Sequence, residues 1–373
     1  MRFELLELLQ LRSDRIKRFV EFKSGSKIDC SKVWHEYEPK PKEIHVLSVD
    51  GSFYSKQYLG YFFGVFGGYA EDYNPETLEQ GESFVGDFYV SVIKKAENFK
   101  IILTLLMFLS EVKSAYNLAK QRNPSLIMLD GTLTSKFIIP FPQTSWFSKQ
   151  DYDFLPKVIE EFYPEVKDNC LNYSSIYSLS DEILEKLSDF EDKRDLLEII
   201  LIQLVYYEYF ITLYNLFMLE SNPVIIGIAK TSTGTDLFNL SVPDIKILLD
   251  NCDKLGYSNS IYQNLQILKC QFGHLPELDP TLNNKLYEIH INSFYAKYKD
   301  VRAINLIEYY HKERTVNPED LLDYISGTIA DGNPYPFILK RMDKEVRITK
   351  EDFGLIENKL DFIFNQTGRE FLG

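Results

Sequence analysis

The stretch HVLSVDGSF, residues 45–53, sets the interpretation of the whole chain, because it is an apolar run that ends in Asp-Gly-Ser. A short apolar run bounded by a turn signal is typical of a buried strand. The next stretch, YLGYFFGVFGGYA (58–70), is aromatic, and its glycines indicate bends in a second strand. SFVGDFYVSVI (83–93) alternates as a third strand does. The three segments predict an antiparallel meander.

The period of the pattern changes after the third strand. Apolar residues recur every three or four positions between 97 and 121, which predicts a helix. LIMLDGTL (126–133) then predicts a further buried strand. Strand–strand–strand–helix–strand is the opening order of a ribonuclease-H-like fold. We therefore expect an α/β protein with a ribonuclease-H-like mixed sheet flanked by helices.

The remaining patterns predict a helical insertion and C-terminal additions to this core. Further helices are expected at 181–220, 243–252, 319–332 with Gly332 as the stop, and from Thr349 onward, and further strands at 222–231 and within 286–310. These patterns divide the chain into an N-terminal helical segment, 1–40, and a main domain, 41–373, with inserted helices at about 150–221. The segment from Leu196 to Leu219 is apolar on more than one face, which predicts a heavily buried or dimer-forming helix that contributes to self-association.

The composition is that of a folded protein with an acidic surface. The chain has 373 residues, which allows two domains or one large domain with insertions, and its 14% aromatic content excludes a disordered chain. The net charge of −14 counts against a nucleic-acid binder, although a metal site needs carboxylates and a local basic groove can coexist with an acidic exterior. The longest apolar stretch, Ile101–Leu109, is too short to span a membrane.

The four cysteines give no metal or disulfide signature. Cys30, Cys170, Cys252 and Cys270 include no C-x-x-C pair, and a disulfide framework is not expected in a chain of this length. We therefore expect a reduced, cytoplasmic environment.

Asp50 and Asp130 are the first candidates for chemistry. Each ends an apolar strand and is followed by Gly and a hydroxyl residue, in VDGS and LDGT. If the two strands are neighbours, the carboxylates converge and repel each other unless a cation lies between them. Hard divalent metals prefer such oxygen ligands. The competing interpretation is that Asp-Gly is a common turn signal.

Glu111 is the third candidate ligand, on the helix between the two aspartate strands. Its neighbours Phe108, Val112 and Ala115 are apolar, which places Glu111 at the edge of the buried stripe, where a carboxylate is costly unless paired or metal-bound. The alternative is an exposed glutamate beside Lys113. Three such carboxylates suit two metal ions that hydrolyse a phosphodiester without a nucleophilic side chain.

Five segments in this order resemble the NurA nuclease family over most of the chain. They are IHVLSVDGS, FLSEVKSAYNLA, LIMLDGTL, VIIGIAKTS and NPYPFI followed by KEVRI. The resemblance implies a ribonuclease-H-like nuclease that uses two manganese or magnesium ions, held by Asp50, Glu111 and Asp130. It also implies a ring-shaped homodimer that binds DNA and works with the hexameric DNA-translocating ATPase HerA in DNA end resection and repair.

The resemblance points to further site residues near the end of the core. Lys230, which leaves a buried strand, is expected to meet a substrate phosphate, the alternative being an ordinary solvent-exposed lysine. Tyr335 belongs to a Tyr-Pro element and is expected to bind substrate. The histidine that often follows in the family is absent, so Asp343 either supplies a last ligand or pairs on the surface with Lys344 or Arg347. Glu308 is another candidate acid.

The leading hypothesis is a nuclease that degrades DNA from 5′ to 3′, with endonuclease action on single strands. No P-loop pattern G-x-x-x-x-G-K-[ST] occurs, which fits a separate motor protein. Phe62, Phe63 and Phe66 either stack on bases or belong to the core. The alternatives are another ribonuclease-H-like nuclease, such as a junction resolvase, and a catalytically weak interaction subunit that docks on an ATPase.

Overall fold

The computed structural model describes residues 11–15, 29–91, 96–139, 149–188, 194–265, 275–313, 316–330 and 333–360. Within the predicted N-terminal helical segment, residues 11–15 are helical, and the short helix η1 (Cys30–Lys32) and strand β1 (Trp34–Glu36) follow. The rest of the predicted N-terminal helix lies outside the described residues.

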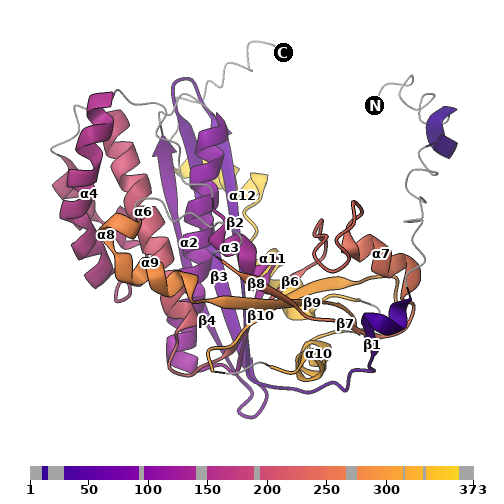
Figure 1. Ribbon diagram of the computed structural model, residues 1–373. Helices are drawn as coiled ribbons and strands as arrows, with labels where there is room; N and C mark the ends of the chain where they lie inside the picture. The colour runs from indigo at the N-terminus through magenta and orange to yellow at the C-terminus, as the bar shows by residue number, and fades with distance from the viewer. Residues whose placement is uncertain are drawn as a thin grey trace.

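The described strands form one ten-stranded sheet, in the order β1-β7-β9-β10-β6-β5-β2-β3-β4, with β8 paired to β9 (Figure 1). Their bounds are β2 (Val46–Gln57), β3 (Phe62–Asn74), β4 (Glu79–Ser91), β5 (Leu126–Asp130), β6 (Val224–Ala229), β7 (Gly256–Ser258), β8 (Ile261–Asn264), β9 (His290–Lys297) and β10 (Asn305–Tyr310). The predicted meander is present, because β2, β3 and β4 pair antiparallel. β5 pairs parallel with both β2 and β6, so the sheet is mixed as predicted.

Helices cover both faces of this sheet. On one face α2 (Ala96–Arg122) lies against β2, β3 and β4, with α6 (Arg194–Phe217) and α4 (Lys149–Asn169) stacked outside it (Figure 1). On the other face lie α10 (Pro318–Gly327) and α11 (Phe337–Val346). The predicted α/β class with a mixed sheet flanked by helices is therefore confirmed, while the ribonuclease-H-like assignment within that class stays a prediction.

The remaining helices are short. They are α3 (Leu133–Phe137), η2 (Tyr177–Leu179), α5 (Asp181–Leu187), α7 (Asp244–Asn251), α8 (Leu275–Leu278), α9 (Pro280–Tyr287) and α12 (Lys350–Lys359). The helices α4, η2, α5 and α6 occupy the region where the insertion was expected. The predicted stop at Gly332 is wrong, because α10 ends at Gly327 with Thr328 as its cap.

The two longest apolar helices are core helices of this chain. α2 and α6 each contain a window long and apolar enough to cross a membrane, but 72% and 94% of these windows are buried inside the protein. For Leu196–Leu219 this favours the buried alternative over the dimer-forming one, because packing within the chain already covers the apolar faces on which self-association would depend.

The structure decides one open alternative and changes one expectation. Phe62, Phe63 and Phe66 are buried in the core and offer no surface for stacking on bases. Cys252, at the end of α7, is disulfide-bonded, contrary to the expectation of no disulfide, so cysteine usage no longer argues for a reduced compartment. Cys170 is a free, buried thiol.

Candidate metal centre

Asp50 and Asp130 lie side by side at the point where two parallel strands stop pairing. The last paired residues of β2 and β5 are Val49 and Leu129, and the two aspartates follow them directly. Neighbouring strands are about 4.8 Å apart, and residues at the same level of a parallel pair point to the same face. Both carboxylates therefore emerge from the sheet together, which is the convergence that the sequence predicted.

Glu111 approaches Asp50 from the face of the sheet that α2 covers. It can do so because α2 packs close to β2 and β3. A Cβ on Gly68 of β3 would lie 2.2 Å from the backbone nitrogen of Glu111. A Cβ on Gly51 of β2 would lie 2.8 Å from Cγ of Met107. Two glycines thus let the helix bring a buried carboxylate up to the strand that carries Asp50.

Asp130 is held by two groups from distant parts of the chain. The Tyr335 hydroxyl donates to Asp130 Oδ1 at 2.7 Å, and Lys230 Nζ lies 3.1 Å from Oδ2. The Lys230 ammonium also lies 4.1 Å from the centre of the Tyr335 ring, a cation–π contact. Lys230 is half-exposed, at 54%, whereas Tyr335 is buried, so the lysine can turn toward a ligand while the tyrosine stays in place.

Glu111 has a buried lysine as its partner. Lys136 Nζ donates to both carboxylate oxygens of Glu111, each at 2.7 Å, and both side chains are almost fully buried. Lys136 belongs to α3, the five-residue helix that follows the Asp130-Gly131 turn. The sequence analysis did not identify this lysine, although an ammonium six residues after a candidate metal ligand was a signal that could have drawn attention to it.

Glu308 anchors that short helix and does not join the carboxylate group. Its Oε2 accepts the backbone N–H of Thr134 at 2.7 Å, and its Oε1 accepts the Thr134 hydroxyl at 2.9 Å. Burial raises the pKa of Glu308, and these hydrogen bonds oppose that rise. Both carboxylate oxygens of Glu308, the further candidate acid, thus accept hydrogen bonds at the first turn of α3.

Asp343 has a charged partner close by in sequence. It forms an ion pair with Arg347 along α11, at 2.5 Å, and its side chain is about half exposed. The structure shows the surface pair with Arg347 that the sequence offered for Asp343, while its role as a last metal ligand stays a prediction.

Burial and neighbouring charges shift the pKa values of Asp50, Glu111 and Tyr335. Burial, followed by the charges of Glu111 and Asp130, raises the pKa of Asp50 to about 7. Burial also raises the pKa of Glu111, and its ion pair with Lys136 acts in the opposite direction. Burial and the neighbouring Asp130 raise the pKa of Tyr335. A carboxylate such as Asp50 holds its charge poorly here unless a cation compensates it.

This shift predicts how the stability of the metal-free protein depends on pH. The pKa of Asp50 in the folded chain, about 7, exceeds the value of about 3.9 in an unfolded chain. The protonated carboxyl therefore stabilises the fold at low pH, and this contribution is lost as the pH rises through about 7. In the presence of EDTA, the thermal midpoint should fall between about pH 4 and about pH 7 and level off above that, and Asp50→Asn should flatten the fall. Parallel curves for the two proteins would exclude Asp50 as its source.

The carboxylates of Asp50, Glu111 and Asp130 suit a hard divalent cation in ligand type and charge. Their donor atoms are carboxylate oxygens, which manganese and magnesium prefer over sulfur or imidazole. Within the described ranges, no three acidic, histidine or cysteine side chains are already gathered in a ligand cluster. The reason is local: Glu111 faces Lys136, and Asp130 faces Lys230 and Tyr335. A metal would have to take over carboxylate oxygens that now contact protein cations.

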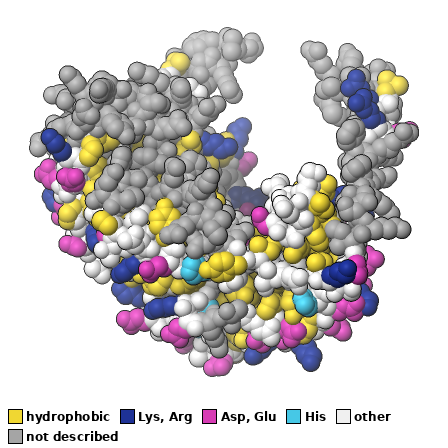
Figure 2. Space-filling view, viewed as in Figure 1, with side chains coloured by type: hydrophobic (Ala, Val, Ile, Leu, Met, Phe, Trp, Pro, Cys, Tyr) yellow, Lys and Arg dark blue, Asp and Glu magenta, His cyan; other side chains and the backbone are white. Residues whose placement is uncertain are grey.

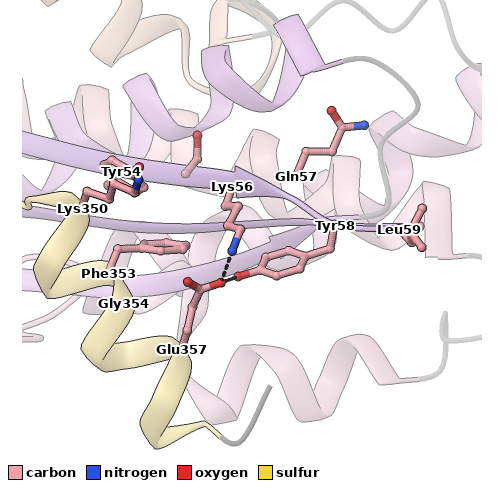
Figure 3. A pocket seen from close by; sticks show the side chains of 11 residues that line it. Tyr54, Lys56, Gln57, Tyr58, Leu59, Lys350, Phe353, Gly354 and Glu357 are labelled. Carbon is pink, nitrogen blue, oxygen red and sulfur yellow. Dashed lines mark hydrogen bonds and ion pairs between the residues drawn. The ribbon is translucent and has the colours of Figure 1, made fainter. Parts of the chain in front are cut away.

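A cavity lined by residues of β2 and α12 lies away from these carboxylates. It has a volume of about 650 Å³ and lies between the end of β2 and α12 (Figure 3). Lys56 and Tyr58 both contact Glu357 across it, the lysine at 2.8 Å. Lys56 lies six residues beyond Asp50 on β2, about 20 Å along an extended strand. On the face shown in Figure 2, acidic and basic side chains are interspersed.

Comparison with known proteins identifies the family. The sequence matches the NurA domain over residues 45–348. It is 25% identical, over 98% of this chain and 91% of the relative, to a protein of Methanocaldococcus jannaschii named as a probable DNA double-strand break repair nuclease NurA. The fold resembles the crystal structure of the NurA nuclease from Sulfolobus solfataricus, with a TM-score of 0.64 and 18% identity over 97% and 98% of the two chains.

A second similar structure is that of NurA bound to dAMP and manganese, with a TM-score of 0.56 and 17% identity over 93% of both chains. The domain match covers the strands of Asp50 and Asp130, the helix of Glu111 and the segment of Tyr335. The chain belongs to the NurA family.

Proposed function

We propose that this protein is a metal-dependent DNA nuclease with its centre at Asp50, Glu111 and Asp130. The observation that carries the proposal is the emergence of two aspartates at the same level of adjacent parallel strands, with a buried glutamate brought up behind them. Membership of a family whose relatives are named as DNA double-strand break repair nucleases supports it, as does a similar structure that holds dAMP and manganese.

The protein groups would have separate tasks. Bound manganese or magnesium would activate water and stabilise the leaving oxygen of the phosphodiester. Asp50, Glu111 and Asp130 would hold the metal, and Tyr335 would fix the orientation of Asp130 through its hydroxyl. Lys230 can leave Asp130 for a substrate phosphate because its side chain is half-exposed. No side chain needs to act as a nucleophile in this arrangement.

The finer features of the proposal rest on the family resemblance. They are 5′-to-3′ exonuclease action, endonuclease action on single strands, two metal ions, a homodimer, a HerA-type hexameric ATPase as partner in end resection, and a cytoplasmic location. The buried state of α6 implies that a dimer would use a surface other than that helix.

A digestion experiment tests the activity and its polarity together. Linear duplex and single-stranded oligonucleotides, labelled at the 5′ or the 3′ end, are incubated with the purified protein in manganese, in magnesium and in EDTA. We expect cleavage with manganese and none in EDTA, because the carboxylates supply no nucleophile of their own. Early release of a mononucleotide from the 5′ label, with the 3′ label retained on shortening fragments, would support 5′-to-3′ action. The reverse order would contradict it.

A catalytically weak interaction subunit is the competing function, and the internal pairing of Glu111 and Asp130 with lysines is the observation in its favour. Such a subunit would bind a hexameric ATPase without cleaving DNA under any metal condition. A junction resolvase on the same fold would instead cut four-way junctions in preference to linear ends. Both substrates in one assay separate these alternatives from the proposed exonuclease.

A further inference from the structure

Lys136 occupies the position on Glu111 that a cation held by both oxygens would need. Its Nζ is 2.7 Å from Oε1 and 2.7 Å from Oε2, so the ammonium binds both carboxylate oxygens at once. The same nitrogen lies 4.3 Å from the centre of the Phe108 ring. An ammonium that contacts an aromatic face as well as a carboxylate keeps one favourable contact if the other is given up.

The protein holds Lys136 there with contacts from two other elements. Glu308 of β10 binds the backbone and hydroxyl of Thr134 at the start of α3. The Tyr209 hydroxyl of α6 donates to the carbonyl of Lys136 at 2.7 Å. A helix of five residues has little stability of its own, so these buried contacts are what keep α3, and hence the ammonium, against Glu111.

We propose that Lys136 is a built-in counter-ion of the metal centre, which holds Glu111 until a divalent cation takes over its oxygens. The inference rests on the proposed metal centre and adds a regulatory feature to it. The lysine and the metal compete for the same carboxylate, and the positive charge of the lysine also repels the metal at short range. Lys136 thereby lowers metal affinity while it keeps the metal-free fold stable. It is a positioning residue and takes no part in the reaction itself.

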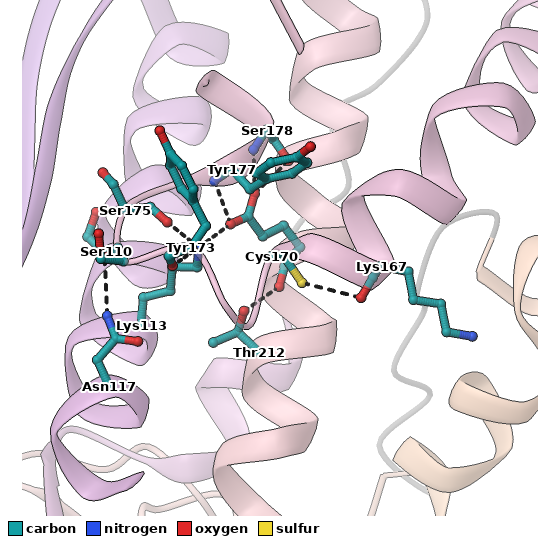
Figure 4. A network of polar contacts seen from close by, with 12 residues as sticks. Ser110, Lys113, Asn117, Lys167, Cys170, Tyr173, Ser175, Tyr177, Ser178 and Thr212 are labelled. Carbon is teal, nitrogen blue, oxygen red and sulfur yellow. Dashed lines mark hydrogen bonds and ion pairs between the residues drawn. The ribbon is translucent and has the colours of Figure 1, made fainter. Parts of the chain in front are cut away.

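The test compares two buried lysines, each paired with a buried glutamate, of which only Glu111 belongs to the proposed metal centre. Lys113 of α2 lies 2.6 Å from Glu208 of α6, and both side chains are as buried as Lys136 and Glu111. Glu208 also accepts the backbone N–H groups of Tyr177 and Ser178, in a polar network between the helices (Figure 4). Lys113→Met is therefore a matched control for Lys136→Met, since each removes one buried ammonium.

Manganese binding is measured by calorimetry and by the rise in thermal midpoint that manganese causes, without DNA. Without metal, both variants should melt below the wild type, because each leaves a buried glutamate without its cation. With metal, Lys136→Met should bind manganese at least about tenfold more tightly than the wild type and show a larger rise in midpoint. Lys113→Met should show the wild-type affinity and the wild-type rise.

Other outcomes distinguish a failure of the proposed metal centre from a failure of the counter-ion role of Lys136. If the wild type binds no manganese, or Asp130→Asn binds it equally well, the proposed metal centre fails. If the wild type binds manganese and Lys136→Met binds it equally or more weakly, the counter-ion inference is wrong while the metal centre stands. Should Lys136→Met not fold even with manganese, Lys136→Arg decides. Its guanidinium can donate two parallel hydrogen bonds to Glu111, so manganese binding should weaken several-fold. Unchanged or tighter manganese binding overturns the inference.

Discussion

Asp130→Asn is expected to reduce manganese-dependent DNA cleavage by about a thousandfold, which corresponds to about 4 kcal/mol of lost transition-state stabilisation. Asparagine has the shape of aspartate and can still accept the Tyr335 hydroxyl at the position of Oδ1. It removes the negative charge that a divalent cation needs and that Lys230 now faces. The fold should survive, because the site is at a strand end and no core contact is lost. Initial cleavage rates at saturating manganese, together with thermal midpoints, measure both effects.

Asp343→Asn is the matched control for this substitution. It makes the same chemical change at an exposed ion pair with Arg347, and surface pairs of this kind contribute about 1 kcal/mol or less to stability. Its cleavage rate should remain within about twofold of the wild type, as is usual for a surface change that touches no substrate. A loss as large as that of Asp130→Asn would instead place Asp343 in the centre. Normal cleavage by Asp130→Asn would remove Asp130 from it.

Gly68→Ala is expected to cause a large loss of stability, because the added methyl group would collide with the backbone of α2. The added Cβ would lie 2.2 Å from the backbone nitrogen of Glu111 and 2.3 Å from the carbonyl carbon of Ser110. These atoms belong to the helix backbone and cannot turn aside, so α2 as a whole must move away from β3. Overpacking of this kind costs about 1–3 kcal/mol or more. Because the displaced turn carries Glu111, manganese affinity should fall as well.

The control for Gly68→Ala is Gly354→Ala in α12. Among the described residues, no atom beyond the backbone of its own helix and its chain neighbours lies within 4 Å of the Cβ that would be added there, and the residue is helical. Alanine is favoured over glycine inside a helix by about 0.5–1 kcal/mol, so this variant should be as stable as the wild type or slightly more stable. Chemical denaturation gives both free energies of unfolding. Equal stability of the two variants would show that α2 tolerates a shift away from the sheet.

Local periodicity predicted the elements that carry the site. The apolar runs before Asp50 and Asp130 formed the strands β2 and β5, because both had the length and the turn signals of buried strands. Their parallel pairing is a tertiary feature. The three- and four-residue period around Glu111 formed α2. For Phe63 the local pattern could not decide between a core and a binding role, since an aromatic residue suits both, and only the packing of α12 against β3 makes it core.

The sequence by itself determined the strands, the long helices and the position of each carboxylate along its own element, because alternation and helical period are properties of neighbouring residues. Only the tertiary structure decided which groups those carboxylates contact. Lys136, Lys230 and Tyr335 lie 25, 100 and 205 residues from their partners, so no local pattern specifies the pairs. Their contacts depend on how closely α2 and α3 pack on the sheet, which glycine contacts such as that of Gly68 fix in three dimensions.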